Sequence, residues 1–169
     1  MTLHQALFSE WQHEATNTQK ILGRIPNDKL NWKPHPKSRS LKDLAIHICK
    51  VANWGEIIIR SEEYDIAAMP AMPPDLDNNE IILHYFNQVA AKTLNALQNV
   101  TEAQLDEIWI FRREAQIILQ MPKAAVIRRL CLNHLYHHRG QLGVYFRMLD
   151  IPVPGMYGPS ADDLEHFKE

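Results

Sequence analysis

Four long segments of this chain carry apolar residues at helical spacing, and prolines gather between the segments. The spacing predicts helices over residues 2–23, 40–61, 78–97 and 122–149. Amphipathic helices of this length bury their apolar stripes best against one another. The pattern therefore predicts an all-α fold, a four-helix bundle that forms a single domain over residues 1–169.

The region before the last predicted helix is expected to hold a short extra element. Thr101 and Gln104 have the spacing of a capping box and predict a short helix. Residues 109–121 alternate weakly between apolar and polar side chains, which predicts a short hairpin or extended piece. Pro122 fits the first turn of the helix that follows. Residues 69–77 contain three prolines and are expected to form a loop.

Charge and hydropathy exclude several classes of function. The net charge of −2 gives no electrostatic reason to expect nucleic acid or an anionic membrane as a partner. No apolar run approaches membrane-spanning length, and the N-terminal residues do not resemble a signal peptide. Two cysteines, Cys49 and Cys131, are too few for a disulfide framework. We therefore expect a cytoplasmic protein with no nucleic-acid and no membrane partner.

Three histidines lie within five positions of the last predicted helix. His134 and His138 are four residues apart, so their rings lie on one face, one turn apart, and both fall on the apolar stripe. Two imidazoles at that spacing can bind one transition-metal ion without bending the backbone. The competing interpretation is a pair of hydrogen-bonded core histidines, because a buried ring needs a partner for each nitrogen. The pair alone does not decide between them.

His47 is the third candidate ligand. It lies at the border of the apolar stripe of the second predicted helix, and metal sites in bundles are commonly built from facing helices. Three imidazoles would leave at least one coordination position open, which is typical of a catalytic site rather than a closed structural site. Imidazole suits zinc, nickel, copper and iron, so the ligand type alone does not name the metal.

Neighbouring residues have supporting roles in this interpretation. His137 lies nearer to the edge of the stripe than His138 and could replace it, but we interpret it as supporting the ligands or contacting another helix. Gln141, one turn past His138, could form a hydrogen bond near the metal. Arg139 is expected on the outer side of the helix or at an interface. Cys131 could offer a thiolate, although a small buried apolar role is favoured.

No catalytic group can be assigned from the sequence. Glu10, Glu14, Asp43 and Glu56 could act as acid or base only if they reach the metal. The other histidines show no comparable grouping and are expected to be solvent-facing or structural: His4, His13, His35, His84 and His166.

These motifs together resemble the DinB family. The resemblance rests on residues 44–48 around His47 and on residues 134–142 with His134 and His138. The ending of the chain is also similar to that of many members, at residues 144–147, 151–154 and 157–162. The resemblance spans nearly the whole chain, and the combined pattern is specific, whereas a histidine pair four residues apart is not.

The resemblance implies an up-down-down-up four-helix bundle, commonly a homodimer, with a divalent metal held by three histidines. Those residues are His47, His134 and His138 here, and the metal is typically zinc or nickel. Characterised relatives in the wider superfamily include thiol-dependent S-transferases and metal-dependent hydrolases or isomerases. The implied partners are a small-molecule substrate and, for a transferase, a low-molecular-weight thiol.

Two functions are carried forward. The leading one is a metal-dependent enzyme, a hydrolase or thiol S-transferase whose metal activates a water or a thiol. The alternative is a non-catalytic helical bundle with a structural or incidental metal that binds a ligand or a partner. Gly140 and Gly143 in the last helix agree with a homodimer, because close approach of another helix can offset the cost of glycine, about 1 kcal/mol relative to alanine.

Overall fold

Four long helices dominate the computed structural model, which describes residues 1–71, 73 and 75–165. They are α1 (Leu3–Leu22), α2 (Leu41–Arg60), α3 (Asn79–Asn99) and a last helix that runs without interruption through α5 (Lys123–Val126), η3 (Ile127–Leu132) and α6 (Asn133–Met148). Their ends agree with the predicted ranges to within two residues. Met72 and Pro74 of the predicted 69–77 loop, and His166, lie outside the described residues.

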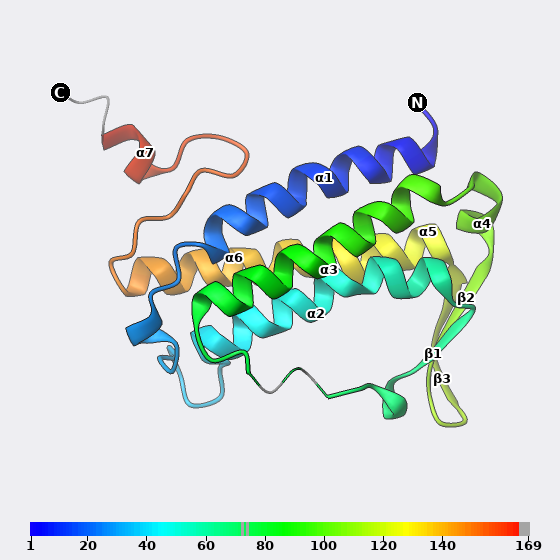
Figure 1. Cartoon of the computed structure of the whole chain (residues 1–169), viewed down its shortest axis with the longest axis horizontal. Helices are drawn as coiled ribbons and strands as arrows, with labels where there is room; N and C mark the ends of the chain where they lie inside the picture. The colour runs from blue at the N-terminus through cyan, green and yellow to red at the C-terminus, as the bar shows by residue number, and fades with distance from the viewer. Residues whose placement is uncertain (72, 74, 166–169) are drawn as a thin grey trace.

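The four long helices enclose a common core. In Figure 1, α3 lies beside α1 and α2, and the last helix packs against α2 and α1. α1 and the last helix run in one direction, whereas α2 and α3 run in the opposite direction. Each helix contributes large side chains that are almost wholly removed from water, among them Trp11, Ile48, Phe86 and Phe146. Burying one such side chain contributes about 1.5–3 kcal/mol.

Polar side chains cap the starts of the first three long helices. Thr2, Ser40 and Asn78 each accept a hydrogen bond from a backbone N–H three residues on. A cap of this kind is typically worth about 1 kcal/mol. The caps explain why these helices begin where the sequence predicts.

α2 lies unusually close to α3 at Gly55. A Cβ atom at this position would collide with the Thr93 side chain. The Thr93 hydroxyl donates to the Ala52 carbonyl at 2.7 Å and accepts from the Glu56 N–H at 3.1 Å. Glycine therefore allows a close approach that fixes the position of α2, the helix that carries His47.

The fold is mostly helical but not all-α, so the predicted class needs a correction. A three-stranded sheet in the order β1-β2-β3 lies at one end of the helices, in the lower right of Figure 1. β2 (Ile108–Arg113) and β3 (Gln116–Pro122) form the predicted hairpin, and β1 (Glu63–Asp65) joins β2 in parallel. β1 has only three residues, too few to show an alternating pattern.

Several short elements connect the long helices. The predicted short helix is confirmed as α4 (Glu102–Asp106), whose capping box joins Thr101 and Gln104. η1 (Asn27–Lys29), η2 (Ile66–Ala68) and α7 (Ala161–Glu165) were not predicted. Within the described part of the chain, no helix combines the length and the apolar character needed to cross a membrane.

Candidate metal centre

Three imidazole rings meet between α2 and α6. His47 Nε2 lies 3.3 Å from His134 Nε2. The ring centre of His138 lies 4.4 Å from that of His47 and 4.6 Å from that of His134. One ligand nitrogen from each ring lies within 4.8 Å of the others, so the group could hold a metal ion. The structure therefore brings together the three histidines that the sequence singled out.

The backbone just before His134 departs from α-helical winding. η3 is a π-helix, a rare form that often occurs at functional sites when it interrupts an α-helix. The ring of His134 forms a hydrogen bond to the backbone of Leu130, which lies inside this segment. The π-helix thus supplies a backbone partner that helps to orient a candidate ligand, and no sequence pattern predicted it.

His138 has one ring nitrogen with a hydrogen-bond partner and one without. Its Nδ1 lies 2.8 Å from Gln141 Oε1, and because that oxygen can only accept, Nδ1 carries the proton of the neutral ring. Its Nε2 then presents a lone pair, yet this atom is buried without a hydrogen-bond partner among the described residues. An unsatisfied buried polar atom costs about 1–3 kcal/mol. A bound metal ion would remove this cost.

The electrostatics of the site keep the three rings neutral near physiological pH. Burial, followed by the charge of Arg39 and the two neighbouring histidines, lowers the pKa of His47 to about 3. Burial also lowers the pKa values of His134 and His138, although hydrogen bonds oppose the shift in both rings. Metals bind the unprotonated imidazole. The lowered pKa values therefore leave the ring lone pairs available.

The spacing of the nitrogen atoms agrees with metal coordination. Two nitrogens bound tetrahedrally to one zinc ion, each about 2.0–2.1 Å from it, lie about 3.3 Å apart. His47 Nε2 and His134 Nε2 have this separation. In the absence of a metal, one of these two rings could donate to the other, but that bond would still leave His138 Nε2 without a partner. The donor set therefore fits a divalent transition-metal ion with at least one position left open.

A pocket of about 380 Å³ opens beside His47 and His134. α2 lines it with His47, Lys50 and Trp54, whose spacing of three and then four residues places them on one helical face. Phe111 of β2 and Leu130 of the last helix line it as well. A small molecule in this pocket would lie next to two of the three candidate ligands. The sequence did not single out the cationic members of the lining.

The carboxylates considered as acid or base groups are engaged elsewhere. No carboxylate among the described residues belongs to the histidine group. Their side chains instead pair with basic or hydroxyl groups, Glu10 with Arg128 and Tyr136, Glu14 with Arg139, Asp43 with Ser40, and Glu56 with Arg60. Within the described ranges, neither the histidine group nor the lining of the adjacent pocket includes a carboxylate that could serve as a general base.

The other candidates lie outside the histidine group. His137 is exposed at the edge of the helix, with its ring centre 4.8 Å from that of His138. Cys131 is fully buried, and burial raises the pKa of its thiol to about 12, so it packs as a small apolar residue. Four further histidines bond to nearby groups on other parts of the chain, namely His4, His13, His35 and His84.

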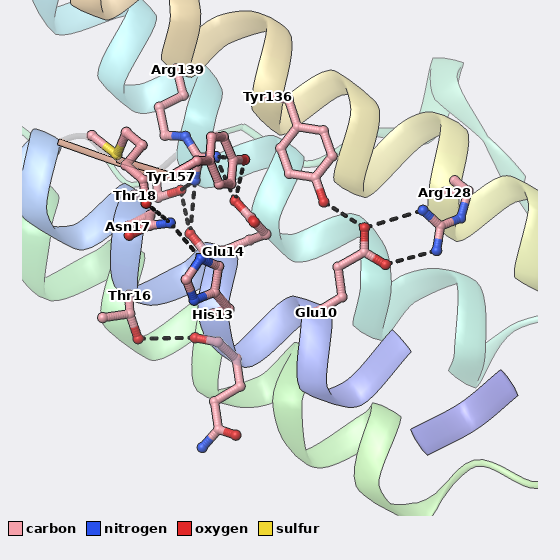
Figure 2. Close-up of polar contacts among 12 residues, drawn as sticks. Glu10, His13, Glu14, Thr16, Asn17, Thr18, Arg128, Tyr136, Arg139 and Tyr157 are labelled. Carbon is pink, nitrogen blue, oxygen red and sulfur yellow. Dashed lines mark hydrogen bonds and ion pairs between the residues drawn. The ribbon is translucent and has the colours of Figure 1, made fainter. Parts of the chain in front are cut away.

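Of the two positions predicted for Arg139, the outer side of the helix or an interface, the structure shows the interface. Its side chain is not on the outside of α6 but points toward α1, where only 4% of it remains exposed. Figure 2 shows its guanidinium donating to Glu14 Oε2 at 2.5 Å and to the Thr18 hydroxyl at 3.2 Å. The Tyr157 hydroxyl joins the same cluster and donates to Glu14 Oε2 at 2.9 Å. Helical spacing alone could not reveal a buried carboxylate on another helix.

Comparison with known proteins gives a consistent assignment. The sequence model of the DinB family matches residues 1–169. The chain is 28% identical over 157 residues to the uncharacterised protein YrdA of Bacillus subtilis, which covers 93% of this chain and 89% of YrdA.

Solved structures of DinB-like proteins share the fold. One from Bacillus cereus superposes with a TM-score of 0.69 at 26% identity and covers 90% of this chain and 97% of its own. The DinB-like protein YjoA of Bacillus subtilis superposes with a TM-score of 0.73 at 22% identity and covers 92% of this chain and 99% of its own.

Proposed function

Because the chain belongs to the DinB family, we propose that it is a metal-dependent enzyme in which His47, His134 and His138 hold one divalent transition-metal ion, zinc or nickel. The observation that carries the proposal is the buried Nε2 of His138, which lacks a partner beside two facing imidazole nitrogens. We also assign the four long helices to the family's up-down-down-up bundle, in agreement with their directions in Figure 1.

The proposed reaction is hydrolysis or thiol S-transfer on a small molecule, with a low-molecular-weight thiol as the second partner in a transfer. When bound in this site, a divalent ion would lower the pKa of a coordinated water or thiol. The result would be a nucleophile near neutral pH. His47 and His134 border both the ion site and the pocket, so they position the reacting group. Gln141 orients the buried His138 ring through its Nδ1 hydrogen bond.

Elemental analysis of protein purified without a histidine tag tests the metal assignment. We expect close to one ion per chain in the wild type and close to none in His134→Ala. His84→Ala is the matched control, because it removes an exposed histidine that bonds to Gln88 outside the site, and it should keep the wild-type metal content. A wild type that holds no transition metal even after reconstitution would refute the proposal.

Chelation separates an enzyme from a bundle with a structural or incidental metal. For an enzyme, we expect the chelated protein to keep its helical circular dichroism, and we expect the reloaded protein to turn over activated esters or thiol-transfer substrates. His134→Ala should fold but not turn over either substrate. A steep fall of the melting temperature on chelation, with no turnover by the metal-loaded protein, would support the non-catalytic alternative instead.

We further propose a homodimer through the outer face of α6. A Cβ atom at Gly140 would meet no described atom within 4 Å beyond its own stretch of helix backbone, and Val144 and Met148, one and two turns on, are 59% and 55% exposed. Gly143 offers less support, because Val153 of the same chain lies 3.9 Å from its Cβ position. Light scattering should give a dimeric mass, and a monomeric mass at high protein concentration would contradict this assignment.

A further inference from the structure

A second, smaller hollow lies next to the pocket beside the histidines, because the two share part of their lining. The larger space measures about 380 Å³ and the smaller about 90 Å³, and Lys50, Trp54 and Met69 line both. The two adjacent hollows are together called the α2 groove here, and the larger of them borders His47 and His134. Its volume lies at the low end of the range of about 300–1,000 Å³ for ligand pockets. The α2 groove therefore suits a small molecule.

The charged side chains that line the α2 groove, apart from the histidines, are cationic. They are Arg39 and Lys50, and within the part of the chain that the structure describes neither hollow is lined by an aspartate or glutamate. Among the described residues, neither cation forms an ion pair, whereas Lys123, Arg112 and Arg139 all do. Two cations without a protein counter-charge beside a cavity favour an anionic occupant.

The rest of the groove wall is mostly apolar, with Asn53, Tyr64 and Tyr85 as its polar members. Trp54 is only 8% exposed and makes edge contacts with Tyr64 and Phe111, at ring-centre distances of 5.0 Å and 5.6 Å. Ile66 of η2 and Met69 line the same space. Aromatic rings held in this way offer a fixed apolar surface at little conformational cost. This wall suits an apolar body rather than a sugar or a nucleotide.

We propose that the substrate is a small organic carboxylate with an aromatic or branched apolar body. The body packs against Trp54 and Phe111, and the carboxylate pairs with Arg39 and Lys50, which act as specificity-determining residues. Charge-assisted hydrogen bonds from arginine and lysine to carboxylates are among the strongest available. The inference rests on the proposed function in one respect, namely that the reacting group of the molecule faces His47 and His134 while its carboxylate serves only for binding.

Two probes of nearly equal shape test this proposal. Phenylacetate carries the charge, phenylacetamide lacks it, and binding of each to the metal-loaded protein is measured by calorimetry. We expect the wild type to bind phenylacetate about tenfold more tightly than phenylacetamide. Lys50→Met and Arg39→Met should each reduce this ratio, and the double variant should abolish it. Lys92→Met, an exposed lysine on α3 that lines neither hollow, should leave the ratio unchanged.

The same measurement on His134→Ala separates this inference from the metal assignment. If the two cations bind the carboxylate, the preference survives in His134→Ala and disappears in the double variant. A preference that vanishes in His134→Ala but survives in the double variant would mean that the ion binds the carboxylate, and it would overturn the inference. Equal binding of both probes by the wild type, or binding of neither at millimolar concentration, would also overturn it. If the wild type holds no metal but still prefers phenylacetate to phenylacetamide, the proposed metal-dependent function is refuted and the inference about the carboxylate stands.

Discussion

His138 and Arg139 are consecutive residues of α6, nearly equally buried, yet they meet opposite chemical surroundings. They are 8% and 4% exposed. Arg139 points toward α1, where Glu14, Thr18 and Tyr157 take up its hydrogen bonds (Figure 2). His138 points toward α2, where its Nε2 has no partner in the part of the chain that the structure describes. A buried polar side chain is therefore not by itself a sign of a binding site, and what distinguishes His138 is an unpartnered ring nitrogen beside two other imidazoles.

The cluster around Arg139 has a structural role, because its members hold the segment before α7 against α1. Tyr157 bonds to Glu14, and the Asn17 side-chain amide donates to the Met156 carbonyl at 3.2 Å (Figure 2). These contacts tie the segment before α7 to α1. The cluster around Arg139 thus stabilises the fold, whereas the cluster around His138 leaves one buried nitrogen without a partner among the described residues.

The largest expected effect comes from breaking the Arg139 cluster. Arg139→Met leaves the Glu14 carboxylate buried without a counter-charge, so the free energy of unfolding should fall by about 3–5 kcal/mol. Urea unfolding followed by circular dichroism measures the loss. Arg128→Met is the matched control, because Arg128 pairs with Glu10 between the same helices but is 46% exposed, and it should cost no more than about 1 kcal/mol.

A double variant sharpens this test. Glu14→Leu combined with Arg139→Met leaves no buried charge unpaired and should recover most of the lost free energy. Equal losses for Arg128→Met and Arg139→Met would break the comparison, because the extent of burial would then not determine the effect.

A smaller effect is expected from a change at Gln141, the hydrogen-bond partner of the candidate ligand His138. Gln141→Leu removes the acceptor that orients the His138 ring, so affinity for zinc should fall about 10–100-fold. Competition with a chromophoric chelator measures this affinity. Gln88→Leu, which removes the equivalent partner of His84 on α3, should leave it unchanged. An unaltered affinity in Gln141→Leu would show that this hydrogen bond does not prepare the ring.

The smallest effect concerns the pH dependence of the metal-free protein. The unfolded chain protonates His47 below its ordinary pKa of 6.5, whereas in the folded chain burial keeps the ring neutral down to about pH 3. The contribution of the neutral His47 ring to the free energy of unfolding is therefore present above pH 6.5. It is lost as the pH falls from 6.5 toward about 3. Because the ring is partly exposed, we expect a loss of only about 1 kcal/mol between pH 7 and pH 5.5.

Urea unfolding at a series of pH values measures this loss, with His47→Gln as the comparison. The variant lacks the titrating ring and should show a flatter dependence on pH than the wild type. Identical curves for the two proteins would mean that the neutral His47 ring does not limit stability in acid.

Local signals predicted much of the fold and part of the site. The four long helices were predictable because each repeats its apolar positions over many turns, and α4 was predictable from its capping residues. β1 was not, because its three residues pair in parallel with β2 more than 40 positions further on. The π-helix and the cations of the α2 groove also lacked a sequence signal, since both depend on how distant segments pack.

The sequence by itself determined which residues share a helical face, because 3.6 residues per turn set the direction of each side chain. It therefore placed His134 and His138 together one turn apart, and it marked His47 as facing inward. Only the tertiary structure decided which helix each face meets. Helix packing brings His47 within 3.3 Å of His134 and sets Glu14 against Arg139. These contacts between helices depend on side-chain packing between distant segments. The spacing of residues within one helix carries no information about that packing.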